Sequence, residues 1–259
     1  MKKTSCLILV FAIIVVCFAP TKAIAASAVG SIDTIIIDLY NDSESAPQQT
    51  SAMALGSLYM LYFIIGNTCE DQNRIDAVSE LVSSITDTVG EFDGAPQVSA
   101  LSLYGCVYEL CAIAYEKDRY GVYSDLITSV IDDLTTADTS SAVQEMAVAS
   151  YRMVDVLSII AIEDGCSSEL VSNINDTLTK NNANLSGAPQ QTANGLYRSA
   201  ELVYLISQKK CSILTANKIY SLLNSMYEDN DNCQSAVQQT TNGMATIYLM
   251  LRTIAYEKA

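Results

Sequence analysis

The sequence predicts an all-α protein made of five tandem two-helix repeats of about 47 residues each. Three observations predict it: a recurring tetrapeptide, apolar residues spaced by three and four after it, and polar stretches between the helices. The tetrapeptide consists of Ser or Gly, then Ala, then Pro or Val, then Gln. It occurs five times, with the Ala at positions 46, 95, 142, 188 and 236. The spacings of 49, 47, 46 and 48 residues are too regular for chance.

Each repeat is predicted to contain a long helix that begins at this marker alanine. Apolar residues recur at offsets 8, 12, 15 and 18 from the marker, which places them on one helix face. Proline is tolerated in the first turn, and Ser45, Ser141 or Ser235 can supply the preceding cap. We expect these helices to end near residues 69, 118, 165 and 211.

A shorter periodic segment before each marker predicts the second helix of the pair. These segments lie at 35–39, 81–89, 126–134, 170–178 and 219–226. The stretches between helices are rich in Gly, Asn, Asp and Ser, as turns are. An amphipathic pair of this size cannot bury its apolar face alone, so the pairs are expected to stack into one α-solenoid. A closed multi-helix bundle of the same ten helices is the alternative.

Two of the long-helix starts resemble the helix that opens HEAT and armadillo repeats. They are Val143-Gln144, followed by Ala147, Ser150 and Tyr151, and Val237-Gln238, followed by Thr241 and Met244. The resemblance spans the whole predicted mature chain and implies an α-solenoid. Gln stands where that family commonly carries Arg.

The first 25 residues are predicted to be a secretory signal peptide. Lys2 and Lys3 precede fourteen apolar residues, and Ala23-Ile24-Ala25 forms a small-x-small cleavage site. The apolar run is shorter than the roughly 18 residues that cross a bilayer. We therefore expect residues 26–259 to form a single secreted helical-repeat domain with no membrane association after cleavage.

The composition excludes several kinds of chemistry. The chain has no His, which rules out His-containing catalytic dyads and triads and His-bearing metal centres. Removing the three lysines of residues 1–25 leaves 14 − 3 = 11 basic residues against 29 acidic ones, a net charge of −18. Nucleic acid is not an expected partner for such an acidic surface. The sequence indicates no cofactor, no metal site and no catalytic residue.

The strongest polar signal is one glutamine per repeat, in the first turn of each long helix. We expect each amide either to satisfy a free backbone group or to bond to its equivalent in the next repeat. A polar stripe that binds an extended partner is the functional alternative. The five residues are Gln48, Gln97, Gln144, Gln190 and Gln238.

Six cysteines lie outside the predicted signal peptide, and an even number in an exported chain favours disulfides. Buried free thiols are the alternative interpretation. Cys166 and Cys211, at equivalent helix ends, are the pair that we expect to be bonded. The six candidates are Cys69, Cys106, Cys111, Cys166, Cys211 and Cys233.

Tyrosines also recur at repeat positions, and aromatic residues at helical spacing are usually part of a core. If some line a groove, they would offer contact area to a peptide or a glycan. Tyr104, Tyr151 and Tyr197 share one position, Tyr59 and Tyr108 a second, and Tyr62 and Tyr204 a third.

The predicted function is that of a secreted, non-enzymatic scaffold that binds a protein or peptide along its stacked helices. One alternative is an extracellular structural, matrix or fibre component that self-associates through cysteines. A second is a hydrolase of the carboxylate type, which needs only two acidic residues.

Overall fold

The computed structural model describes residues 22–89, 94–136 and 141–259, and within these ranges it contains helices and no strands. The all-α prediction and the five predicted helix pairs are confirmed. The predicted signal peptide lies outside the described residues, apart from its last four, which begin the first helix. In chain order the helices are α2 (Lys22–Asn41), α3 (Ala46–Thr68), α4 (Gln72–Val89), α5 (Ala95–Lys117), α6 (Ser124–Thr136), α7 (Ala142–Glu163), α8 (Ser168–Asn182), α9 (Ala188–Lys210), α10 (Ile213–Asn230) and α11 (Ala236–Lys258).

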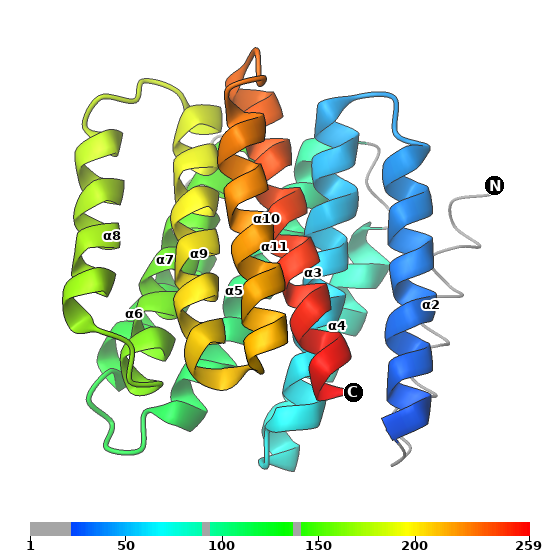
Figure 1. Ribbon diagram of the computed structural model, residues 1–259, viewed down its shortest axis with the longest axis vertical. Coiled ribbons are helices and arrows are strands. Elements are labelled where there is room, and N and C mark those ends of the chain that lie inside the picture. The colour runs from blue at the N-terminus through cyan, green and yellow to red at the C-terminus, as the bar shows by residue number, and fades with distance from the viewer. Residues whose placement is uncertain (1–21, 90–93, 137–140) are drawn as a thin grey trace.

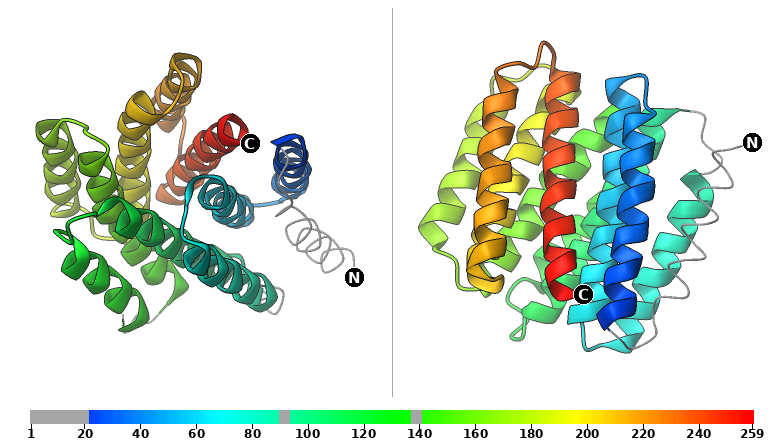
Figure 2. Two further views of the ribbon diagram at one scale, coloured as in Figure 1. Left: turned by 90° about the horizontal axis from the view of Figure 1, so that it is seen from below. Right: turned by 45° about the vertical axis from the view of Figure 1, so that its right-hand side comes forward.

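The five long helices form a closed inner ring. Each of α3, α5, α7, α9 and α11 packs against the next along the chain, and α11 also packs against α3 (Figures 1 and 2). The shorter helices form an outer layer, each resting against two inner helices. Of the two arrangements left open by the sequence, the repeats therefore adopt the closed one. Closure hides the apolar faces that the two end repeats of an open stack would expose.

Two close contacts seal the junction between the first and last repeats. The hydroxyl oxygens of Thr50 and Thr241 lie 2.8 Å apart and are buried. A Cβ on Gly56 would come within 2.7 Å of the Tyr248 ring, so α3 and α11 approach closely only because this residue has no side chain. On the outside, Asp33 of α2 accepts hydrogen bonds from the hydroxyl of Tyr248 at 2.7 Å and pairs with Nε of Arg252 at 3.0 Å.

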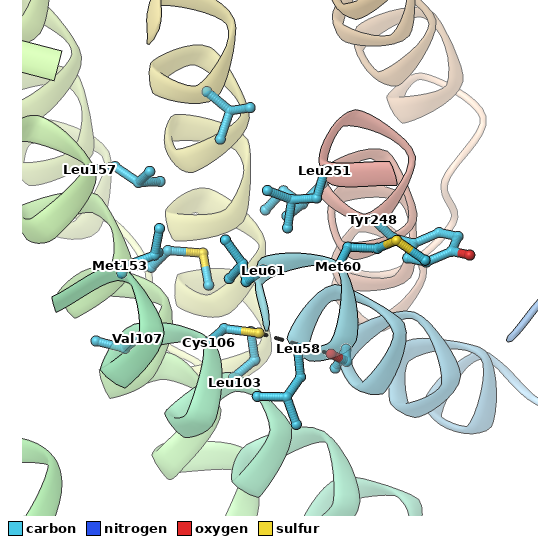
Figure 3. Packing of buried hydrophobic residues seen from close by; sticks show 14 of the residues in the cluster. Leu58, Met60, Leu61, Leu103, Cys106, Val107, Met153, Leu157, Tyr248 and Leu251 are labelled. Carbon is cyan, nitrogen blue, oxygen red and sulfur yellow. Dashed lines mark hydrogen bonds between the residues drawn. The ribbon is translucent and has the colours of Figure 1, made fainter. Parts of the chain in front are cut away.

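The middle of the ring is filled by side chains rather than open. Figure 3 shows Leu61, Leu157 and Leu251, from three different inner helices, converging on this space. They occupy the same repeat position, fifteen residues after the marker, and the other two repeats place Leu110 and Val203 there. All five are at most 6% exposed. The apolar pattern in the sequence thus corresponds to a continuous core.

The predicted starts of all five inner helices are confirmed at the marker alanine. The predicted serine caps are only partly confirmed. Ser235 accepts a hydrogen bond from the backbone N–H of Gln238, whereas the side chains of Ser45 and Ser141 cap no backbone N–H.

One core position departs from the repeat pattern. Glu109 lies fourteen residues after its marker, where the other repeats carry Met60, Val156, Leu202 and Met250, and all five side chains are fully buried. Neither carboxylate oxygen of Glu109 has a hydrogen-bond partner among the described residues. Burial raises the pKa of this carboxyl well above its usual value, because desolvation disfavours the charged form.

Helix α5 is the one helix of the described ranges that is long and apolar enough to cross a bilayer. Most of it is buried in the inner ring, as is usual for a core helix of a folded protein.

Candidate functional site

The two ends of the helical ring differ in their exposed side chains. We call the end where the inner helices finish the loop end; α4, α6, α8 and α10 begin there, and Figure 2 (left) looks onto it. Most of the large apolar side chains exposed in the described residues gather at this end. Tyr120 is 91% exposed and Ile213 is 82% exposed. The full set at the loop end is Tyr120, Val122, Leu126, Ile162, Leu170, Ile213, Leu214 and Tyr256.

Basic residues gather at the same end. Of the eleven basic residues that follow residue 25, eight lie within two helical turns of this end, together with ten acidic residues, a local balance of 8 − 10 = −2. The other residues after residue 25 therefore carry −18 + 2 = −16. The loop end is thus close to neutral in an acidic protein. The basic residues are Arg74, Lys117, Arg119, Lys209, Lys210, Lys218, Arg252 and Lys258, and the acidic ones are Glu70, Asp71, Asp76, Glu116, Asp118, Asp125, Glu163, Asp164, Glu169 and Glu257.

A network of polar contacts between repeats fixes the positions of these loops. The segment Ala-Tyr-Glu-Lys occurs at the ends of both α5 and α11. In each, the glutamate reaches the loop of a neighbouring repeat: Glu116 accepts from the backbone N–H of Glu70 at 3.2 Å, and Glu257 accepts from that of Ser212 at 3.0 Å. The exposed apolar side chains are thus carried on braced loops.

An ion cluster around one buried carboxylate braces the same end. Asp164, whose side chain is 2% exposed, lies 2.6 Å from Nζ of Lys117 and 2.9 Å from Nζ of Lys210. These residues come from three consecutive repeats. The buried carboxylate and its two partly exposed lysines connect the ends of three inner helices.

A groove runs over α11 beside α10, in two stretches of about 660 and 500 Å³, and the second stretch extends to the end of α2 and the start of α3. Its floor includes Ala245, at the repeat position where three other repeats carry Tyr104, Tyr151 and Tyr197. The small side chain leaves open a space that a tyrosine covers elsewhere. Hydroxyl groups, Lys218 and Arg252 line one stretch, while Glu44 and Asp229 line the other.

The five glutamines lie at the opposite end of the ring from the loop end. The side-chain oxygen of Gln48 accepts from the backbone N–H of Glu44 at 2.9 Å, and that of Gln238 accepts from Gln234 at 2.6 Å. Gln97 folds back over the cap residue Gly94. In the first and last repeats the amide therefore satisfies a backbone group, which is the structural role expected from the sequence.

The recurring tyrosines mostly join inner helices to outer ones. Tyr59 and Tyr62 of α3 are buried, and their hydroxyls bond to Thr86 and Ser79 of α4 at 3.0 Å each. The Tyr197 hydroxyl donates to the side-chain oxygen of Asn230 at 2.9 Å. The interpretation of these residues as core packing is confirmed for Tyr59, Tyr62 and Tyr197.

All six candidate cysteines are free, and the disulfide expected between Cys166 and Cys211 is not formed. The Cys166 sulfur lies 3.4 Å from the carbonyl oxygen of Leu205, six residues before Cys211 on the same side of the ring. Six helical residues rise about 9 Å, so the Cys166 sulfur contacts α9 nearly two turns before Cys211. Burial raises the pKa of all six thiols, of Cys69, Cys106, Cys111, Cys166, Cys211 and Cys233.

A hydrolase of the carboxylate type would need free acidic side chains, but two of the carboxylates are engaged in ion pairs. Asp133 pairs with Arg152, and Asp164 pairs with the two lysines described above. The described residues contain no group of three His, Cys, Asp or Glu side chains placed to hold a metal ion. Comparison of the chain with protein-family models, curated proteins and solved structures finds no match.

Proposed function

We propose that this protein is a secreted, non-enzymatic binding module that docks a basic protein on its loop end. The observation that carries the proposal is the concentration of exposed apolar side chains at one end of the ring. Single exposed apolar residues are ordinary, whereas a group of them marks an interaction surface. Leu214 and Val122, at 67% and 68% exposed, add to the two side chains already described.

The charge distribution selects the kind of partner. The field of a protein with a net charge of −18 attracts basic molecules and repels acidic ones. The near-neutral loop end lets a partner approach without burying many unpaired carboxylates. A basic protein with an apolar contact area fits both the negative net charge and the near-neutral loop end. An anionic membrane does not, because the net charge repels it and the loop end has no excess of positive charge to attract it.

The bracing of the loops supports the same proposal. The glutamate contacts of the Ala-Tyr-Glu-Lys segments and the Asp164 cluster hold the loops before any partner arrives. A surface that is already ordered loses little conformational entropy on binding. The raised pKa values of the thiols count against the alternative of self-association through cysteines, because disulfide exchange requires the thiolate.

The test compares a double variant at the loop end with a matched control. Ile213→Ser combined with Leu214→Ser removes two apolar side chains from the first turn of α10, and Tyr220→Ser removes one from the side of the same helix, where it is 48% exposed. Partners captured from the fluid that surrounds the source cells are identified and measured by surface plasmon resonance. We expect a basic partner whose affinity falls about 100-fold or more in the double variant, since burying each such side chain contributes roughly 1.5–3 kcal/mol. The control keeps the affinity, and the association rate falls as salt is raised.

Two results would refute the proposal. One is a partner that binds the double variant as tightly as the original protein. The other is a homodimer, seen by light scattering, that the double variant abolishes; a second copy would then occupy the loop end.

A further inference from the structure

A second, smaller hollow lies between α8, α9 and α10, toward the glutamine end of the ring. Its volume is about 440 Å³. Its lining contains six side-chain amides and two tyrosines, and its only aliphatic side chains are Leu185 and Ala193. The amides belong to Asn181, Asn184, Gln190, Asn194, Asn230 and Gln239.

The charged groups of this hollow are already paired with each other. Arg198 donates to both oxygens of Glu201, each at 2.8 Å, and the hydroxyl of Tyr227 bonds to the same pair. A guanidinium held in this way has little remaining attraction for an anion, and the carboxylate little for a cation. The hollow therefore offers mainly neutral hydrogen-bonding groups.

The walls of the hollow are fixed by further hydrogen bonds. Asn194 donates to the carbonyl oxygen of Leu178 at 3.2 Å, which ties α9 to α8. The Tyr197 hydroxyl donates to Asn230 and accepts from Asn242 at 3.1 Å, which ties α9 to α10 and α11. The Tyr227 ring, 36% exposed, rests edge-on against Tyr197 at 5.9 Å between ring centroids. A partly exposed aromatic face thus lies beside a fixed array of amides.

Several amide groups are left without partners for use by a ligand. The side-chain amides of Gln190 and Gln239 form no hydrogen bond with other described residues, and the NH₂ group of Asn230 forms none either. A side-chain amide both donates and accepts hydrogen bonds. It can therefore bind neighbouring hydroxyl groups of a ligand, which also donate and accept. An aromatic face packs against the C–H surface of a sugar ring.

We infer that this hollow binds a neutral carbohydrate. The inference is independent of the loop end, which lies at the other end of the ring. The sugar has two possible sources, because Asn184-Leu185-Ser186 at the rim is a glycosylation sequon. A glycan attached to Asn184 and a free glycan share the same chemistry.

Saturation-transfer NMR tests the inference, with the full chain produced in a secreting host and a panel of chitotriose, mannotriose, maltotriose and cellotriose. Gln239→Ala removes a free amide from the hollow, and Gln49→Ala is the matched control at the same repeat position of α3, in the groove over α11. We expect transfer to at least one sugar, weakened about fivefold or more by Gln239→Ala, since a lost neutral hydrogen bond contributes about 1 kcal/mol. Gln49→Ala leaves it unchanged. Circular dichroism checks that both variants are folded.

The same panel is run on Asn184→Gln to separate the two sources. Binding of free sugar only to this variant shows that the protein's own glycan fills the hollow, and binding to both proteins shows a site for an external glycan. No transfer to any sugar in either protein would overturn the inference. Equal loss of binding in Gln239→Ala and Gln49→Ala would overturn it too, because the sugar would then lie elsewhere.

Discussion

Replacing Glu109 with methionine is expected to stabilise the protein, by an amount that grows with pH. The carboxyl is fully buried and neither oxygen has a partner among the described residues. Methionine has a similar volume and length, and the first and fifth repeats carry it at the equivalent positions 60 and 250. The substitution therefore removes a buried polar group without creating a cavity.

The magnitude follows from the raised pKa of the carboxyl. In the unfolded chain Glu109 ionises near its ordinary value of 4.5, whereas in the folded protein desolvation keeps it protonated well above that value. Unfolding then releases a proton, so the stability of the native protein falls as pH rises through this window. The loss is at most about 1.4 kcal/mol per pH unit, and it continues only up to the raised pKa of the folded carboxyl.

Urea unfolding followed by far-ultraviolet circular dichroism at pH 5, 6 and 7 measures the effect. The free energy of unfolding of Glu109→Met should exceed that of the original protein at pH 7, and the gap should narrow toward pH 5 by at most about 1.4 kcal/mol per pH unit. Glu80→Met, at an exposed position of α4, controls for the loss of one negative charge. A gap that does not change with pH, or one that the Glu80 variant reproduces, would refute the reasoning.

Three further predictions concern the ring, each measured as a change in the urea unfolding free energy. Gly195→Ala should cost about 1–3 kcal/mol, because its Cβ would come within 2.5 Å of the Ser150 hydroxyl oxygen and 3.0 Å of its backbone. Gly30→Ala should not destabilise, because its Cβ would meet only the Tyr256 hydroxyl oxygen, at an ordinary contact distance of 3.4 Å. Asp33→Ala should cost about 1–3 kcal/mol, because it removes the shared acceptor that holds α2 to α11, and an unchanged midpoint would contradict this role. Gln48→Ala should cost about 0.5–1.5 kcal/mol through the lost bond to the backbone of Glu44, and a loss of partner binding at constant stability would instead favour the partner-binding role.

The loop end was only partly accessible to sequence reasoning. The Ala-Tyr-Glu-Lys segments repeat visibly, but their contacts join residues about 46 positions apart, as Glu116 and Glu70 show. Ile213 and Leu214 lie outside the apolar segment predicted at 219–226, and the structure places both, exposed, in the first turn of α10. A signal that would have helped is the apolar side chain in the first turn of three outer helices, at Leu126, Leu170 and Ile213.

The cysteines show the same limit. Cys166 and Cys211 are equivalent by position along their repeats, and equivalence suggested a bond. Their separation depends on how far neighbouring inner helices are displaced along their axes, and a repeat spacing carries no information about that displacement. The sulfur of Cys166 contacts the carbonyl oxygen of Leu205 instead of the sulfur of Cys211.

The sequence by itself determined the helices, their starts at the marker alanines and the pairing of long with short segments, because these follow from apolar spacing and turn composition within one repeat. Only the tertiary structure decided that the stack closes, since closure depends on small angles between neighbouring pairs added over all five repeats. The α3–α11 contact at Gly56 and the clasp at Asp33 join residues about 190 to 215 positions apart, as the Thr50–Thr241 and Asp33–Tyr248 bonds show. A closed ring has two distinct ends, and that is why the apolar loops gather on one surface instead of being spread along a solenoid.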